Sequence, residues 1–292
     1  MIVLNKIIKN FNKKPVLNNI DMNIYNNEII GLIGKNGAGK TTLIKMISGL
    51  IKPDSGYVKS KHGTTISCLL DDGGIIPELS AYENLKLKAL RLNISNYEIK
   101  KVMNLLDINE YGNKKVKDFS LGMRRRTAIA VCLINKPKLL LLDEPINGLD
   151  PQGIKDVRNI IEEIHKESGI SILISSHNLD QLAKVATRYI FMNQGKIIEN
   201  INKNDLNKKL NNKLIIKVDA KSIKQAKLVM NKYFSSCSKF IEEYNDGIAY
   251  SIDKNLNNNV ILTLIKNKIP ITEIFNDDTT LEEYFLRIVE ED

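Results

Sequence analysis

An eight-residue stretch at positions 34–41, GKNGAGKT, has the residue types and spacing of a phosphate-binding loop. It fits the pattern G-x-x-x-x-G-K-[ST] without a gap. Gly37 and Gly39 allow the backbone to curl, so that successive N–H groups point at phosphate oxygens. Lys40 would reach the β- and γ-phosphates of a nucleotide, and the Thr41 hydroxyl would bind Mg²⁺.

The segments on either side of this motif have the pattern that a phosphate loop requires. Residues 29–33 form an almost entirely apolar run, which predicts a buried strand. Residues 42–50 have the spacing of an amphipathic helix, whose positive dipole end would face the phosphates. The alternative is a chance match, and the order strand, glycine loop, helix argues against it.

Three further apolar runs end at polar residues. They span residues 66–70, 139–142 and 170–174, and such runs fit parallel strands that are covered on both faces. In open α/β sheets, ligands bind beyond the carboxyl ends of the strands. We therefore expect one phosphate site to gather the residues Lys40, Asp71, Asp143, Glu144 and His177.

Residues 78–136 have helical patterns instead and are interpreted as an insertion in the α/β domain. Ser80 predicts the N-cap of a first helix, and Ser95 with Glu98 predicts a capping box for a second. A third helix is expected to follow Ser120. Antiparallel strands with an Asn-rich turn are expected in the first 30 residues, and a hairpin over 192–201 closes the domain.

Composition indicates a soluble protein rather than a membrane-spanning one. The apolar fraction is 43%, and no segment approaches the ~18 uninterrupted apolar residues that a span needs. The first ten residues have no apolar stretch long enough for a signal peptide, so we expect a cytosolic protein. The three cysteines are far apart and in no C-x-x-C pair, which predicts buried free thiols at Cys68, Cys132 and Cys237.

The formal net charge of +9 raises the question of a nucleic-acid or membrane partner. The lysines are scattered, however, and the longest basic cluster is only three residues, at 124–126. A nucleic-acid footprint should gather basic residues on one face. We therefore expect no nucleic-acid partner.

Taken in order, the motifs of residues 1–205 resemble the ATP-binding subunit of an ABC transporter. GKNGAGKT is similar to the Walker A loop of that family, and KLLLLDEP at 138–145 resembles Walker B. FSLGMRRR at 119–126 stands in the place of the family signature LSGGQ, and NGLD at 147–150 looks like the D-loop. SSHNLDQLA contains the switch histidine, and Phe11 stands where the family has an aromatic that stacks on adenine.

The resemblance implies a role for each matching residue. Glu144 would be the general base for the attacking water, and His177 and Lys40 would contact the γ-phosphate. Asp143 and Thr41 would hold Mg²⁺. The implied nucleotide contacts are Phe11, Gly34, Lys35, Asn36, Gly37, Ala38, Gly39, Lys40, Thr41 and Thr42. The implied contacts to the ATP of a second copy are Ser120, Leu121, Gly122 and Met123, with Asp150 in the D-loop.

One chain carries one Walker A loop and one signature, so the resemblance implies a head-to-tail pair of chains that traps two ATP molecules. It also implies a separate integral-membrane permease and a location on the cytoplasmic face of the membrane. Two departures from the family pattern stand out. Asp71 replaces a glutamine that contacts Mg²⁺ and water, and we expect the aspartate to keep a metal or water contact. Leu121 and Met123 replace a glycine and a glutamine of the signature.

Residues 206–292 are expected to form a second, α+β domain. The predicted order of elements is βαββαβ, a ferredoxin-like arrangement, with a last helix after it. The turn Asn245-Asp246-Gly247 supports the central hairpin. The predicted strands are 213–218, 239–244, 248–252 and 269–275, and the predicted helices are 222–234, 256–266 and 279–290.

The sequence therefore predicts a P-loop α/β ATPase of the ABC type that uses ATP and Mg²⁺. We interpret it as the subunit that powers a separate permease, with export of a drug-like, peptide or lipid-like substrate as the expected direction. The alternatives are a soluble ABC ATPase that acts on nucleic acid or ribosomes, and a regulatory switch that binds nucleotide without hydrolysis.

Overall fold

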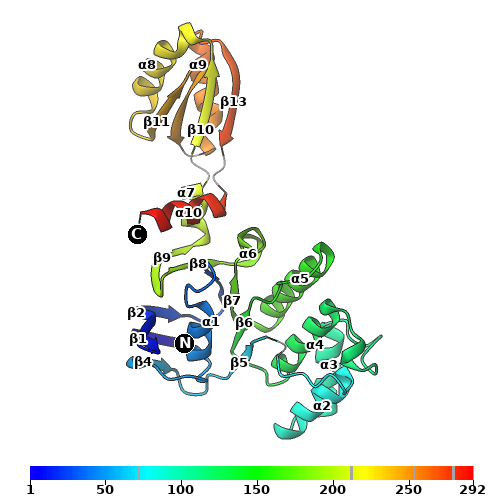
Figure 1. Cartoon of the computed structure of the whole chain (residues 1–292). Helices are drawn as coiled ribbons and strands as arrows, with labels where there is room; N and C mark the ends of the chain where they lie inside the picture. The colour runs from blue at the N-terminus through cyan, green and yellow to red at the C-terminus, as the bar shows by residue number, and fades with distance from the viewer. Residues whose placement is uncertain (72, 211–212, 253, 278–279, 292) are drawn as a thin grey trace. The chain divides into compact units, whose positions relative to one another are not determined.

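The computed structural model describes residues 1–71, 73–210, 213–252, 254–277 and 280–291 (Figure 1). The chain divides into two compact units, Met1–Ile201 and Asn202–Glu291. Each unit has its own hydrophobic core, so each is described by itself.

A six-stranded sheet forms the centre of the first unit, in the order β5-β6-β7-β3-β8-β9. The pairs from β5 to β8 are parallel, so the carboxyl ends of five strands meet at one edge. The four leucines of β6 are fully buried, as expected for a strand covered on both faces. The strands are β3 (Ile29–Ile33), β5 (Ile66–Leu69), β6 (Leu139–Asp143), β7 (Ser171–Ser176), β8 (Arg188–Asn193) and β9 (Lys196–Asn202).

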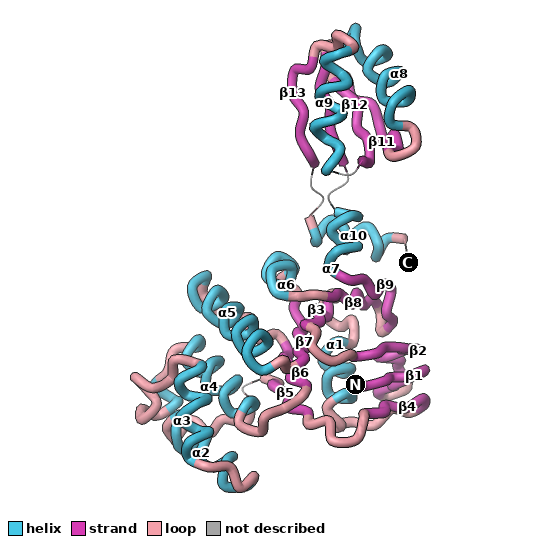
Figure 2. Tube along the Cα trace, turned by 180° about the vertical axis from the view of Figure 1, so that it is seen from behind, coloured by secondary structure: helices cyan, strands magenta, loops and turns pink. Residues whose placement is uncertain are grey.

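The antiparallel strands predicted in the first 30 residues are confirmed as β1 (Ile2–Phe11) and β2 (Lys14–Ile24). A third strand that was not predicted, β4 (Ser55–Ser60), pairs with β1 and completes a sheet of order β2-β1-β4. Helix α1 (Lys40–Ile47) lies between this sheet and the central one (Figure 2). Its buried residues Leu43 and Ile44 belong to one core cluster with side chains of both sheets. The β8–β9 hairpin is also confirmed, because the two strands are neighbours in the sheet.

Helices occupy the predicted insertion between β5 and β6 (Figure 1). Ser80 caps the first helix in a full capping box with Glu83, and the Ser120 hydroxyl caps the third by accepting from the N–H of Met123. The helices of the first unit are α1, α2 (Ala81–Arg91), α3 (Asn96–Leu105), α4 (Leu121–Leu133), α5 (Pro151–Ser168) and α6 (Leu179–Val185), with a 3₁₀ turn at Val116–Asp118.

The predicted capping box at Ser95 is wrong. The Ser95 side chain makes no capping hydrogen bond at the start of α3. The Glu98 carboxylate instead pairs with Lys136 Nζ at 2.8 Å. A partner from the far end of the insertion, 38 residues along the chain, competes with the local cap.

The second unit confirms the predicted βαββαβ order. Its sheet has the order β11-β12-β10-β13 with every pair antiparallel, and α8 and α9 cover one face (Figures 1 and 2). The start predicted for the last helix, Thr279, lies outside the described residues, and the helix begins at Leu281 with Thr280 as its cap. The elements are α7 (Lys203–Leu210), β10 (Lys213–Val218), α8 (Ile223–Phe234), β11 (Ser238–Tyr244), β12 (Gly247–Ile252), α9 (Asn257–Lys266), β13 (Ile271–Asp277) and α10 (Leu281–Glu290), with 3₁₀ turns at Ala220–Ser222 and Lys254–Leu256.

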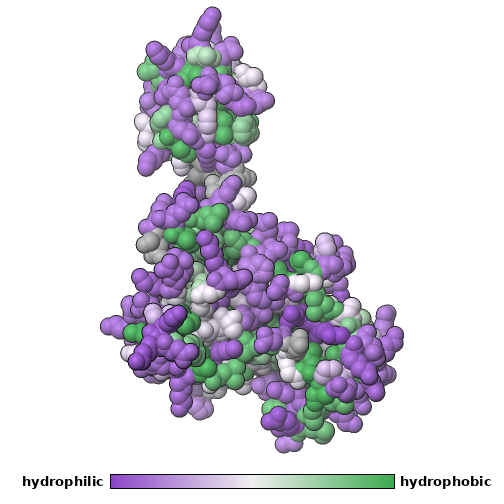
Figure 3. Space-filling view, in the orientation of Figure 1, coloured by the Kyte–Doolittle hydropathy of each residue, from purple (hydrophilic) through white to green (hydrophobic). Residues whose placement is uncertain are grey.

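The surface that Figure 3 displays is mostly hydrophilic, with apolar residues in separate patches. None of the helices in the described ranges combines the length and the apolar character needed to cross a bilayer. The prediction of three buried thiols is wrong for one of them. Cys132 is buried and Cys68 is half-buried, but Cys237 is exposed because it lies in the turn between α8 and β11.

Candidate nucleotide site

The glycine loop connects β3 to α1 at the edge where the parallel strands end. Gly37 has a φ of 83° and Gly39 a φ of 101°, in the left-handed region that glycine adopts without strain. A Cβ on Gly39 would lie 2.8 Å from the carbonyl oxygen of Val16, so any side chain there would force the loop to move. The loop conformation therefore requires glycine where the sequence has it.

Lys40 begins α1, and its side chain curls back over the loop. The residue is only 7% exposed. Its Nζ donates to the carbonyl oxygen of Gly34 at 2.7 Å and lies 3.7 Å from Glu144 Oε1. An ammonium group held inside a curled loop provides the positive charge that a phosphate group needs.

Thr41 and Asp143 bring a hydroxyl and a carboxylate together at the end of β6. The Thr41 Oγ1 donates to Asp143 Oδ2 at 2.7 Å. The other carboxylate oxygen, Oδ1, accepts from the Ser175 hydroxyl. Oxygen donors of these two kinds are what Mg²⁺ prefers, so the residues present fit a magnesium ion.

Ser175 was not predicted as a site residue, although it makes two site contacts. It pairs with Asp143 in the parallel register of β6 and β7, and it is fully buried. Its hydroxyl donates to Asp143 and accepts from the N–H of Glu144 at 3.0 Å. The signal that could have found it is a serine at the end of an apolar strand, where a buried hydroxyl needs a partner.

Glu144 and His177 form the second pair at this edge. His177 Nδ1 lies 2.8 Å from Glu144 Oε2, which leaves Oε1 facing Lys40. Glu144 has a φ of 47°, a strained backbone for a non-glycine residue that costs about 1–3 kcal/mol. Its N–H donates to the Ser175 carbonyl oxygen as well as to the hydroxyl, which holds the strained turn in place.

Asp71 lies at the same edge but outside this network. It follows β5 by two residues and has a φ of 47°. Its backbone carbonyl accepts from Arg125 Nη1 at 2.8 Å, and its side chain is exposed. Within the described ranges, no hydrogen bond or ion pair joins its carboxylate to Lys40, Asp143 or Glu144. The structure thus brings together five of the predicted residues and leaves the expected metal or water contact of Asp71 as a prediction.

Phe11 ends β1, and the residue is 47% exposed. Lys9 Nζ lies 5.5 Å from the centre of that ring. An exposed aromatic ring can stack on a purine base, and the stacking of Phe11 on adenine stays a prediction.

The residues of the FSLGMRRR motif are on a separate part of the surface. Ser120, Leu121, Gly122 and Met123 begin α4 and line a pocket of about 930 Å³ together with Asp150. The Asp150 carboxylate accepts from the N–H of Gly153 at 3.0 Å and caps α5. None of the residues of the Lys40 network lines this pocket. Within one chain, the signature residues and the Lys40 network are therefore separate.

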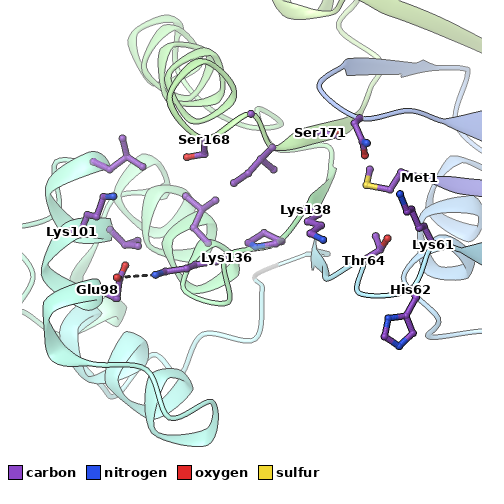
Figure 4. Close-up of a pocket in the computed structure, with 17 residues that line it drawn as sticks. Met1, Lys61, His62, Thr64, Glu98, Lys101, Lys136, Lys138, Ser168 and Ser171 are labelled. Atoms are coloured by element: carbon purple, nitrogen blue, oxygen red, sulfur yellow. Dashed lines mark ion pairs between the residues drawn. The ribbon is translucent and has the colours of Figure 1, made fainter.

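A second pocket, of about 590 Å³, lies at the opposite edge of the sheet (Figure 4). It contains none of the predicted site residues. Figure 4 shows Lys101, Glu98 and Lys136 on one side and Lys61, His62 and Thr64 on the other. Helices α3, α4 and α5 end near it. Lys136 has a structural partner there, since its Nζ pairs with Glu98 at 2.8 Å.

Comparison with known proteins gives consistent matches. A family model described as ABC transporter matches residues 17–147. The lantibiotic transport ATP-binding protein SrtF of Streptococcus pyogenes is 39% identical over 205 residues, which cover 68% of this chain and 89% of that protein. The bacitracin transport ATP-binding protein BcrA of Enterococcus faecalis is 30% identical over 295 residues, or 97% of this chain and 94% of that protein.

The fold is also that of solved ATP-binding cassettes. The dimeric structure of the cassette MJ0796 in a post-hydrolysis state, bound to ADP and Pi, superposes with a TM-score of 0.62 at 24% identity. The superposition covers 70% of this chain and 99% of that one. The ADP conformation of the cassette MJ1267 gives the same TM-score at 25% identity, with 70% and 92% of the two chains covered.

Proposed function

The chain belongs to the ATP-binding proteins of ABC transporters, and from this we propose that it hydrolyses MgATP at the Lys40 loop to power export of a peptide antibiotic through a separate permease. Membership of the family makes it an ATP-binding ATPase subunit of a transporter. The observation that supports the proposed site is the contact network of Lys40, Thr41, Asp143, Glu144 and His177 at one sheet edge.

In this proposal the loop binds and orients the terminal phosphates of ATP. Lys40 exchanges its contact with the Gly34 carbonyl for the β- and γ-phosphates, and the backbone N–H groups of residues 37–41 donate to phosphate oxygens. Thr41 and Asp143 would hold Mg²⁺, which when bound supplies positive charge against the phosphates. Phosphoryl transfer depends mainly on such positioning and charge stabilisation.

Glu144 then accepts the proton of the attacking water. Its Oε2 is held by His177 at 2.8 Å, and its backbone is held by Ser175. The carboxylate therefore has one orientation, which a general base needs. The His177 side chain is about half exposed, and in this proposal it would contact the γ-phosphate as well.

The pocket lined by Ser120–Met123 and Asp150 supports a second part of the proposal, a dimer that closes over ATP. The first turn of α4 offers free N–H groups and the positive end of a helix dipole around Ser120 and Gly122. These groups would contact the γ-phosphate bound by the Lys40 loop of the second copy. Two chains would then trap two nucleotides, and hydrolysis would release them.

The proposal that a peptide antibiotic is exported is supported by analogy with the relatives. The names of SrtF and BcrA refer to transport of a lantibiotic and of bacitracin. By that analogy we propose a substrate of the same class, a permease as partner, and a place on the cytoplasmic face of the membrane. The Arg124–Arg126 cluster does not support the nucleic-acid alternative, because each of its side chains contacts another part of the protein.

Steady-state MgATP turnover by the purified chain tests the proposed activity, with Glu144→Gln as the matched variant. We expect turnover in the native chain and a fall of at least ~10²-fold in Glu144→Gln, with nucleotide binding kept, because only the base is lost.

A native chain that binds ATP without turnover would favour the regulatory switch instead. Asp71 motivates that second candidate, since an aspartate stands where the family pattern has a glutamine. Co-purification with a polytopic membrane protein in detergent tests the partner.

A further inference from the structure

Three consecutive arginines of α4 contact three different segments of the first unit. Arg124 donates to the carbonyl oxygens of Phe119 and Lys117, at 3.2 and 2.9 Å, in the segment before the helix. Arg126 pairs with Asp156 of α5, the helix that Asp150 caps. The side chain between them, Arg125, donates to the carbonyl oxygen of Asp71 at 2.8 Å. The basic run of the sequence is therefore a set of internal contacts around the signature motif.

The loop after β5 packs directly on α4. Gly73 has a φ of 68°, and a Cβ there would lie 2.5 Å from Leu69 Cδ1 and 3.0 Å from Ala128 Cβ. Ala128 is three residues after Arg125, so both are on one face of the helix. The loop thus has two contacts with this face, the hydrogen bond to Asp71 and the close approach at Gly73.

Asp71 lies beyond the end of its own strand, in a turn closed by a hydrogen bond from the Gly73 N–H to the Leu70 carbonyl oxygen at 2.8 Å. β5 ends at Leu69 and is the edge strand of the sheet, with β6 as its single neighbour. The φ of 47° at Asp71 is a conformation that an aspartate tolerates but that does not continue the strand. Arg125 therefore ties the backbone of this turn, at the edge where the parallel strands end, to α4.

We propose that Arg125 is a positioning residue that fixes Asp71 to the signature helix, so that the Asp71 carboxylate and the Ser120–Met123 turn move together. This inference rests on the proposed function. Arg125 does not contact nucleotide; it acts through the Asp71 backbone. The planar guanidinium can donate from a fixed direction, which neither a lysine nor a glutamine reproduces.

The test compares Arg125→Gln and Arg125→Lys with Arg91→Gln as the matched control. Arg91 is exposed at the end of α2 and makes no hydrogen bond or ion pair among the residues that the structure covers. We expect kcat to fall ~10-fold in Arg125→Gln with the dissociation constant of ATP unchanged. Without Arg125, Asp71 would be held less firmly, and loss of positioning lowers the rate rather than the affinity. Arg125→Lys should recover part of the rate, and Arg91→Gln should match the native chain.

A double-mutant cycle separates positioning from general destabilisation. If Arg125 acts through Asp71, then Asp71→Ala changes kcat and the Mg²⁺ concentration for half-maximal rate in the native chain, but has no further effect in Arg125→Gln. Additive effects, or an Arg125→Gln rate equal to that of Arg91→Gln, would overturn the inference. If Arg125→Gln does not fold, the same cycle is run with Arg125→Lys and read by the same criterion. Loss of turnover in the native chain would reject the proposed function instead, so the two failures differ.

Discussion

Ser175→Ala is the change that tests the site network most closely. The hydroxyl is fully buried and makes two contacts, one to the Asp143 carboxylate and one from the N–H of Glu144. A hydrogen bond to a charged group is worth about 1.5–3 kcal/mol. We expect a loss of ~2 kcal/mol in the free energy of unfolding, or roughly 4–8 °C in Tm for a unit of about 200 residues.

The same substitution should reduce turnover. Glu144 keeps its bond to the Ser175 carbonyl oxygen at 3.2 Å, so its strained backbone loses one of two acceptors. Asp143 keeps Thr41 as a partner. Because Glu144 and Asp143 each keep one hydrogen-bond partner, we predict a fall of ~10-fold in kcat. This is less than the ~10²-fold that a misplacement of about 1 Å can cost.

Ser171→Ala is the matched control on the same strand. Ser171 is also buried, and its hydroxyl makes two hydrogen bonds to backbone groups, with Tyr25 and Asn27, at the opposite end of β7. It should lose about 1–2 kcal/mol of stability with no change in kcat. Differential scanning fluorimetry and a coupled ATPase assay measure both quantities. If the two variants turned over ATP at the same rate, the idea that Ser175 positions the catalytic carboxylates would be refuted.

Further predictions concern the loop, the metal and the thiols. Gly39→Ala should lose most nucleotide binding in a fluorescent-ATP titration, because its Cβ would lie 2.8 Å from the Val16 carbonyl oxygen; affinity equal to the native chain would contradict the loop geometry. Removal of Mg²⁺ with EDTA should stop turnover, and added Mg²⁺ should restore it, whereas metal-independent turnover would exclude the roles of Thr41 and Asp143. Burial raises the pKa of Cys132 to about 12 and that of Cys68 to about 11, so both stay protonated at pH 8. A thiol reagent at that pH should therefore label one cysteine, Cys237, in the native chain and all three after denaturation; rapid native labelling of Cys132 would contradict its burial.

The parts of the fold set by local sequence were predictable. The glycine loop, its flanking strand and helix, and the Ser80 cap all depend on residues within about a dozen positions of one another. The βαββαβ order of elements along the second unit was predictable for the same reason, since the apolar runs are separated by a helix or a tight turn.

What could not be predicted depends on contacts between distant residues. The role of Ser175 follows from its register against Asp143, and the role of Arg125 follows from a loop 54 residues earlier in the chain. The Ser95 cap was wrong because Lys136, which no local pattern connects to it, takes the Glu98 carboxylate. In each case the sequence contains the residue, but its partner is known only from the fold.

Oligomeric state in the presence of nucleotide is the most direct test of the account. In Glu144→Gln, ATP binds without being cleaved, so light scattering after size exclusion should give the mass of one chain without nucleotide and of two chains with MgATP. Lys40→Ala in the same background should stay monomeric, because the loop no longer holds the ATP that would join the two copies. A Glu144→Gln chain that remains monomeric at saturating MgATP would contradict the claim that two copies close over ATP.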